Sequence, residues 1–204
     1  MTAPPRATAP QLAALPLAIA TARLRLRPIA EDDVDALWPH VTDPEVPRWM
    51  SWRPHGDRAE TLAYVRAERR ALADNHGVAW VIEEAGALIG TIGLRRVQWS
   101  TRAWAVDRAE LGYWLGRPAW GGGRMTEAAR AVTAFAFTVI GLHKLTSGCI
   151  AENHGSRRVL AKLGFRALGV AAQEAWIDGA WRDHLLFELL ADDWRAATAA
   201  AASS

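Results

Sequence analysis

Three consecutive glycines that open a helix are the feature of this sequence with the clearest chemical meaning. The run from Trp120 to Ala128 reads WGGGRMTEA, with Gly121, Gly122 and Gly123 near its start. Glycine has no side chain, so the main-chain N–H groups of such a turn can close around an anion. The positive end of the helix dipole lies at the same place. This run therefore predicts a site for an anion such as a pyrophosphate.

A second run of small and polar residues begins another helix. Asn153 is a favourable N-cap residue, and Ser156 occupies the third position of the first turn. Gly164 and Phe165 have the pattern of a left-handed C-terminal stop with its accompanying hydrophobic contact. Taken with the glycine turn, this helix predicts a pocket for a pyrophosphate that is joined to a thiol-bearing arm.

Two nucleotide-binding motifs do not fit the glycine run. A Walker-type loop needs Lys and then Ser or Thr after its last glycine, but Arg124 and Met125 follow here. A dinucleotide-binding loop needs a further glycine where Thr126 stands. A simple tight turn that leads into a helix is the remaining alternative, and the second run makes it the weaker interpretation.

The elements that must position these two runs follow from hydrophobic periodicity and turn residues. Strands are predicted at 21–28, 78–83, 87–94, 103–115, 144–151, 166–177 and 180–189, and helices at 31–41, 57–75, 124–141 and 153–163. The order strand, glycine turn, helix, strand, helix predicts an α/β arrangement with locally parallel pairing.

One domain accounts for the length of 204 residues. We expect residues 1–20, which contain four of the ten prolines, to form a disordered N-terminal arm. The domain itself is expected to span 21–194, and the Ala- and Ser-rich residues 195–204 are expected to form a flexible tail.

Composition excludes several classes of protein. A formal net charge of +2 does not indicate nucleic-acid binding, and no stretch approaches the roughly 20 apolar residues of a membrane span. Cys149 is the only cysteine, which is compatible with a reducing cytoplasm and with a packing role for a small buried thiol. The six histidines include no pair with metal-ligand spacing, so we expect no metal.

Several motifs in a fixed order resemble the Gcn5-related N-acetyltransferase (GNAT) superfamily, over roughly Thr21 to Trp194. The motifs are 88–94 (LIGTIGL), 109–115 (AELGYWL), the two runs above and 178–183 (DGAWRD). The similarity is closest to the ribosomal-protein-alanine/serine N-acetyltransferase branch. The resemblance implies an α/β (α+β) fold with a mixed central sheet of about seven strands, split between the fourth and fifth strands and flanked by about four helices.

The same resemblance implies a site for acetyl-coenzyme A in the split of the sheet. The residues that correspond to the pantetheine, pyrophosphate and sulfur contacts of the family are Trp114, Leu115, Gly116, Gly121, Gly122, Gly123, Arg124, Met125, Thr126, Asn153 and Ser156. Met125 replaces the usual small residue, which is compatible with the site if its side chain enters the core.

Three side chains are the candidate catalysts. Glu110 is the candidate base, acting through water; the alternative is that it pairs with an arginine on the solvent face. Ser156 is the candidate acid for the departing sulfur, and Tyr113 competes with Glu110 for a proton-handling role. A thiol titrates near ~8.5, so its thiolate is a tolerable leaving group.

The expected activity is transfer of an acetyl group from acetyl-coenzyme A to a primary amine by direct attack in a ternary complex. An α-amino group, with a pKa near ~7.7 to 8.0, loses its proton far more easily than lysine near ~10.4, which favours a protein N-terminus as acceptor. The alternatives are a small-molecule amine such as an antibiotic, a longer acyl group, or a catalytically silent acyl-coenzyme A sensor. The protein is expected to be a monomer or homodimer, with no nucleic-acid or membrane partner.

Overall fold

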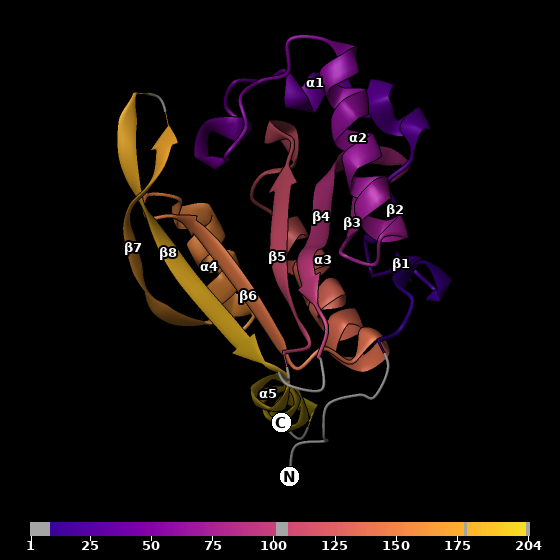
Figure 1. Cartoon of the computed structure of the whole chain (residues 1–204), viewed down its shortest axis with the longest axis vertical. Coiled ribbons are helices and arrows are strands. Elements are labelled where there is room, and N and C mark those ends of the chain that lie inside the picture. The colour runs from indigo at the N-terminus through magenta and orange to yellow at the C-terminus, as the bar shows by residue number, and fades with distance from the viewer. Residues whose placement is uncertain (1–8, 101–105, 178, 203–204) are drawn as a thin grey trace.

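A mixed β-sheet runs through the protein and carries its helices on both faces (Figure 1). The computed structural model describes residues 9–100, 106–177 and 179–202. Within these residues the sheet has eight strands in the order β1-β2-β3-β4-β5-β6-β8-β7. Every neighbouring pair is antiparallel except β5 and β6, which are parallel. The strands are β1 (Ile19–Ala20), β2 (Leu24–Pro28), β3 (Val78–Glu84), β4 (Ala87–Gln98), β5 (Arg108–Leu115), β6 (Lys144–Ile150), β7 (Arg166–Ile177) and β8 (Ala180–Leu190).

Five α-helices connect or follow these strands in the described residues. They are α1 (Val34–Val41), α2 (Arg58–Ala73), α3 (Arg124–Phe135), α4 (His154–Lys162) and α5 (Ala191–Ala202). Short 3-10 turns lie at Leu12–Ala14, Glu31–Asp33, Pro47–Trp49 and Arg117–Ala119, and a π-helical turn at Ala136–Ile140 extends α3. None of the described helices is both long enough and apolar enough to cross a bilayer.

The architecture confirms the predicted mixed sheet and its split. The sheet has eight strands instead of about seven because the two-residue β1 adds to one edge. If β1 is set aside, β5 and β6 are the fourth and fifth strands, and they diverge along their length (Figure 1). Five helices stand in place of about four because the C-terminal residues form α5.

Alternation along β3 explains why the sheet is covered on both faces. Trp80 and Ile82 belong to the core cluster that includes α3, and Trp80 stacks edge-on against Phe135 at 5.7 Å. Ala79 and Val81 belong to the second cluster, with residues of α1 and α2. A strand that is buried on both faces has a continuous apolar sequence, as the run VAWVI at the start of β3 does. The helices α1 and α2 therefore lie on one face and α3 on the other (Figure 1).

The described part of the N-terminal arm packs against the domain, in contrast to the disorder expected for residues 1–20. Leu12 is fully buried and Leu17 is 8% exposed. The Leu12 N–H donates to Asn75 Oδ1 at 2.8 Å, and Trp80 Nε1 donates to the Leu17 carbonyl at 2.6 Å. Apolar burial and these two hydrogen bonds outweigh the entropy of ordering this segment. Residues 1–8 lie outside the described part of the chain.

Helix α5 takes up most of the segment that was expected to be a flexible tail from residue 195. Its run of alanines has the highest helix propensity, and Asp192 and Asp193 lie favourably in its first turn. Trp194 anchors the helix against Phe137, with ring centroids 5.5 Å apart. Residues 203 and 204 lie outside the described part of the chain.

Two predicted features fall partly on residues that are not described. The strand expected to begin at Ala103 begins at Arg108, and 101–105 lie outside the described residues. The turn predicted at Asp178 and Gly179 joins β7 to β8, where Gly179 has a φ of 74° and Asp178 lies outside the described residues.

A buried carboxylate ties the three C-terminal strands together. Glu188 on β8 is 4% exposed and forms ion pairs with Lys144 of β6 and Arg166 of β7. Arg166 Nε donates to Glu188 Oε1 at 2.8 Å. Hydrogen bonding and attraction to Lys144 hold the pKa of the Glu188 carboxyl below its usual value.

Glu188 makes stability depend on pH in the acid range. A carboxyl whose pKa is lowered by folding stabilises the protein above its unfolded pKa of about 4.3, and this contribution is lost as the pH falls through the folded pKa. We therefore expect Glu188→Gln to be less stable than the parent protein at pH 7 and to lose less stability between pH 5 and pH 3. Urea unfolding at several pH values measures this. Glu45→Gln, at an exposed ion pair with Arg48, is the control and should change stability by less than about 0.5 kcal/mol. Parallel pH curves for Glu188→Gln and the parent protein would contradict the assignment.

Candidate functional site

A cleft opens where β5 and β6 separate. Their parallel pairing covers only three residues of each strand, Arg108–Glu110 with Lys144–Thr146. Beyond this point Ser147 Oγ donates to the Leu111 carbonyl at 2.8 Å, so a side chain replaces the backbone bond. Among the described residues, the remainder of β5 then has no strand beside it on the β6 side.

The register of β5 decides which backbone groups face the cleft. The Gly116 N–H donates to the Ile89 carbonyl at 2.8 Å, so alternate residues such as Trp114 bond to β4. By the same alternation Tyr113 and Leu115 direct their N–H and C=O groups toward the separated β6. The Leu115 carbonyl is occupied, since it accepts from Trp120 Nε1 at 2.8 Å. The Leu115 N–H is therefore the donor that this end of β5 offers to the cleft.

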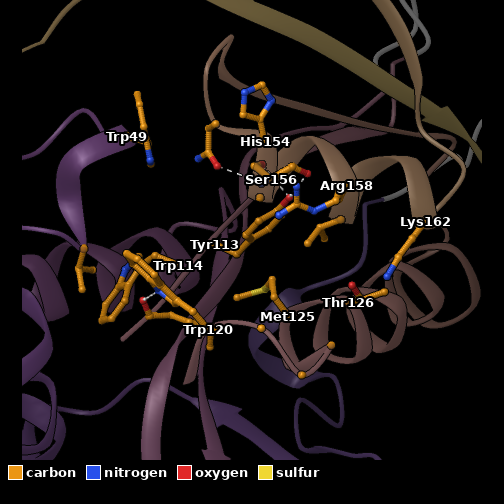
Figure 2. Close-up of a pocket in the computed structure, with 18 of the residues that line it drawn as sticks. Trp49, Tyr113, Trp114, Trp120, Met125, Thr126, His154, Ser156, Arg158 and Lys162 are labelled. Atoms are coloured by element: carbon orange, nitrogen blue, oxygen red, sulfur yellow. Dashed lines mark hydrogen bonds between the residues drawn. The ribbon is translucent and has the colours of Figure 1, made fainter. Parts of the chain in front are cut away.

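The cleft holds a cavity of about 590 Å³ (Figure 2). Its walls come from β5, the glycine turn, α3, the start of α4 and the loop after α1. The lining residues are Val46, Trp49, Met50, Tyr113, Trp114, Leu115, Trp120, Gly121, Gly122, Gly123, Met125, Thr126, Glu152, Asn153, His154, Gly155, Ser156, Arg158, Val159 and Lys162.

The glycine turn presents a row of free amides to this cavity. Gly121, Gly122 and Gly123 have φ values of 76°, 55° and 78°, a left-handed conformation that side chains rarely allow. Among the described residues, no acceptor receives the N–H of any residue from Gly121 to Thr126, and no side chain caps α3. These amides lie at the positive end of the α3 dipole. Such an arrangement favours an anion with several oxygens.

Ionic contacts fix the turn from outside the cavity. Arg124 Nε donates to Glu84 Oε2 at 2.7 Å, and Arg23 Nη1 donates to the Gly122 carbonyl at 3.0 Å. Met125 is 7% exposed and belongs to the main core cluster, so its side chain does enter the core as expected.

A hydrogen-bonded pair lies on the opposite wall, at the start of α4. Asn153 Oδ1 accepts from the Ser156 N–H at 3.0 Å, which confirms the predicted N-cap. The Tyr113 hydroxyl lies 3.0 Å from Ser156 Oγ (Figure 2). Burial raises the pKa of Tyr113 well above its usual value. The phenol therefore keeps its proton at neutral pH and can donate a hydrogen bond to Ser156 or to a group in the cavity.

Nine of the eleven residues predicted to bind the cofactor line the cavity. The two that do not are Gly116 and Arg124. Gly116 packs against the His40 ring so closely that any side chain would overlap it, and the Arg124 side chain turns to Glu84. Arg124 still contributes its N–H to the row of free amides.

The structure brings two of the three candidate catalysts together. Tyr113 and Ser156 line the cavity, whereas Glu110 does not. Arg96 Nη1 donates to Glu110 Oε2 at 2.8 Å, and the Glu110 side chain is 38% exposed. The alternative given for Glu110, an ion pair with an arginine on the solvent face, is thus present in the structure.

The sequence analysis left several cavity residues unassigned. Glu152, Arg158 and Lys162 line the cavity beside Ser156. Helical spacing in the sequence could have indicated two of these residues, because positions 158 and 162 are one turn apart and occupy one face of α4. Trp49 and Met50, in the segment between α1 and α2, also line the cavity.

Two further expectations concern cysteine and metal. Cys149 is buried on β6 at 5% exposure, and burial raises the pKa of its thiol, as suits a residue with a packing role. Over the described ranges, no cluster of three or more His, Cys, Asp or Glu side chains is arranged to hold a metal ion.

Known proteins share this domain. Residues 23–166 match the family model described as "Acetyltransferase (GNAT) domain". The probable N-acetyltransferase YjcK of Bacillus subtilis (strain 168) is 40% identical over 106 residues, which are 52% of this chain and 56% of YjcK. The ribosomal protein uS5-alanine N-acetyltransferase of Escherichia coli (strain K12) is 37% identical over 84 residues, 41% of this chain and 43% of that protein. The chain thus spans about half the length of these two relatives.

A solved structure is similar over most of the chain. Mycobacterium smegmatis RimJ in complex with CoA-disulfide superimposes with a TM-score of 0.74 at 27% sequence identity. The match covers 86% of this chain and 89% of that chain.

The Asn153 cap positions Ser156, and its contribution is measurable. We expect Asn153→Ala to lower the free energy of unfolding by about 1 kcal/mol, because the first turn of α4 loses the acceptor for one of its free amides. Asn153→Asp keeps an acceptor at the same place and should retain most of the stability. Urea unfolding of both variants provides the comparison. Equal losses for Asn153→Ala and Asn153→Asp would show that the cap is not what stabilises this turn.

Proposed function

The chain belongs to the GNAT acetyltransferase family, and from this premise we propose that it transfers an acetyl group from acetyl-coenzyme A to a protein N-terminal α-amine. Membership makes it an acetyl-transferring enzyme that is related to ribosomal-protein N-acetyltransferases. The donor, the acceptor and the roles of individual residues are the proposal.

The free amides from Gly121 to Thr126 are the observation that carries the proposal. All of them except the Arg124 amide belong to residues that line the cavity, and none has an acceptor among the described residues. Consecutive free donors at a helix N-terminus suit the oxygens of a pyrophosphate. Beyond its three residues paired with β6, β5 has no neighbouring strand on that side among the described residues, and this edge suits an amide-bearing arm that pairs with it as an added strand would. Bound there, acetyl-coenzyme A supplies an activated thioester.

Tyr113 and Ser156 are proposed to hold the proton for the departing sulfur. Their oxygens are 3.0 Å apart, and the raised pKa of Tyr113 keeps the phenol protonated. Ser156 Oγ is the donor to the sulfur, and the Tyr113 hydroxyl stays protonated and donates a hydrogen bond that orients Ser156. A proton from water restores Ser156 after the thiol has left. The Leu115 N–H donates to an oxygen on which negative charge develops, which requires no movement of the backbone. In this proposal Tyr113 and Ser156 therefore act on the departure of the sulfur.

Glu110 is proposed to receive the amine proton through water. On β5 it lies on the same face as Trp114, which packs with residues of α1 and α2, whereas Tyr113 faces α4. The four residue steps from Glu110 to Trp114 span about 13 Å of strand, so the Glu110 carboxylate is too far away to contact an amine beside Trp114 directly. Water on this open face can connect the two positions, and the carboxylate is partly exposed to it.

This arrangement favours an acceptor that needs little help in losing its proton. The cavity offers no carboxylate among its described lining residues except Glu152, which pairs with Arg182 at 3.3 Å. An α-amine with a pKa near ~7.7 to 8.0 is partly neutral at pH 7, and lysine near ~10.4 is almost wholly protonated. The related uS5-alanine N-acetyltransferase acts, by its name, on a ribosomal protein alanine.

Coenzyme A release tests the donor and the acceptor together. The purified protein is given acetyl-coenzyme A or a longer acyl-coenzyme A with three acceptors: peptides with a free N-terminus, N-blocked lysine peptides and small amines. We expect turnover to be fastest with acetyl-coenzyme A and free N-terminal peptides. Faster turnover of lysine peptides or small amines would overturn the acceptor. Saturable donor binding without turnover on any acceptor would indicate a silent sensor instead.

The proposed roles predict an order of kinetic effects. We expect Glu110→Gln to lower kcat by about tenfold to a hundredfold, as loss of a base that acts at a distance. Ser156→Ala should cost less, because a thiolate leaves without full protonation. Arg96→Ala is the matched control, since it removes the ion pair but keeps the carboxylate, and it should retain most of kcat. Equal losses for Glu110→Gln and Arg96→Ala would assign Glu110 a structural role. A larger loss for Ser156→Ala would reverse the assignment.

A further inference from the structure

A second cavity adjoins the cleft on the far side of the glycine turn. Its volume is about 680 Å³, and it lies between the residues before β2, α3 and the end of α4. It shares Gly123, Thr126 and Lys162 with the main cavity. Figure 2 shows Lys162 extending from α4 toward Thr126 on α3. A ligand that lies in the cleft can therefore continue into this cavity past the turn.

Basic side chains surround this second cavity. Arg130 and Lys162 line it, one from each helix, and both are exposed. Arg130 lies one turn after Thr126 on the same face of α3, so it follows directly from the row of free amides. Arg158 stands one turn before Lys162 on α4 and lines the main cavity.

These cations have no partner within the part of the chain that the structure describes. No ion pair joins Arg130, Arg158 or Lys162 to a carboxylate there, although most arginines elsewhere on the protein are paired, as Arg23 and Arg124 are. Like charges that converge without a counter-charge are unfavourable unless an anion joins them. This cluster is therefore suited to a ligand with concentrated negative charge.

Glu127, which carries the one carboxylate among the described residues that line this second cavity, does not neutralise these cations. Glu127 accepts from Thr21 Oγ1 at 2.6 Å, from the Arg23 N–H at 3.0 Å and from Arg23 Nε at 2.7 Å. These hydrogen bonds lower the pKa of the Glu127 carboxyl, so it stays ionised and committed to Arg23. Arg130 and Lys162 then leave the cavity with two uncompensated positive charges.

The proposed function gives this charge a ligand. Coenzyme A carries a pyrophosphate at its centre, a thiol at one end and an adenosine with a 3′-phosphate at the other. If its sulfur lies at Ser156 and its pyrophosphate at the glycine turn, the adenosine leaves the cleft toward the second cavity. We propose that Arg130 and Lys162 bind the 3′-phosphate of coenzyme A and make the protein discriminate against donors that lack it. The inference rests on the proposed function and extends it to the far end of the donor.

Binding calorimetry with coenzyme A and dephospho-coenzyme A tests the proposal without catalysis. For the parent protein we expect coenzyme A to bind at least about tenfold more tightly, as charge-assisted hydrogen bonds to one phosphate would give. In Arg130→Ala and in Lys162→Ala this ratio should fall to about threefold or less, while the affinity for dephospho-coenzyme A stays within about twofold of the parent value. The ratio in the parent protein should also fall as salt is added.

Arg70→Ala is the matched control. Arg70 is an exposed arginine on α2, a helix on the opposite face of the sheet from α3, and it also lacks an ion pair among the described residues. Its loss should leave the ratio unchanged. Equal binding of the two ligands by the parent protein would overturn the phosphate site and leave the proposed function intact. Equal weakening of both ligands in Arg130→Ala and Lys162→Ala would do the same. If neither coenzyme A nor dephospho-coenzyme A bound to the parent protein, both the phosphate site and the proposed function would be overturned.

Discussion

The early end of the pairing between β5 and β6 is the constraint on which the site depends. A parallel pair normally continues along the length of both strands, because unpaired backbone groups inside a protein are costly. Here three residues of each strand pair, and Ser147 then bonds to the Leu111 carbonyl in place of the backbone. The edge of β5 that no longer pairs with β6 borders the cavity, which Tyr113, Trp114 and Leu115 line. A ligand with its own amides can complete the sheet at this point, so the break in the sheet creates the binding site.

The alternation of β5 then distributes chemistry over the two faces of the sheet. Tyr113 faces α4 and contacts Ser156, while Trp114 and Glu110 face α1 and α2. The proposed proton donor to the leaving group and the proposed base thus lie on opposite faces of the sheet. The proposed roles require the amine to approach from the α1 and α2 face, and Trp49 and Met50, in the loop between those helices, line the cavity. This separation accounts for the distance between Glu110 and the cavity.

Local signals were sufficient for the parts of the fold and site that depend on few residues. The glycine turn, the Asn153 cap and the helix after it follow from backbone preferences, and they appear at the predicted positions. Long-range contacts escaped prediction for a physical reason. Leu12 is held by Asn75, 63 residues away, and no local pattern reports that contact. Glu110 meets Arg96 because β4 is irregular between Arg95 and Gln98, where Arg96 has a φ of 49°. The sequence contains both residues but not the irregularity that brings them together.

Net charge illustrates the same limit for electrostatics. A formal charge of +2 over 204 residues argues against a long polyanion as ligand, which would need a broad basic face. It says nothing about a compact anion, because the field at a site depends on which charges are paired locally. Most arginines here bind carboxylates and contribute to structure, as Arg27 does with Asp33 and Glu83. Arg130 and Lys162 lie beside a helix N-terminus whose amides are also free, so their fields add to the α3 dipole. A nearly neutral protein can therefore present a positively charged groove. The ion pairs in the structure reveal such a groove, whereas the amino-acid composition does not.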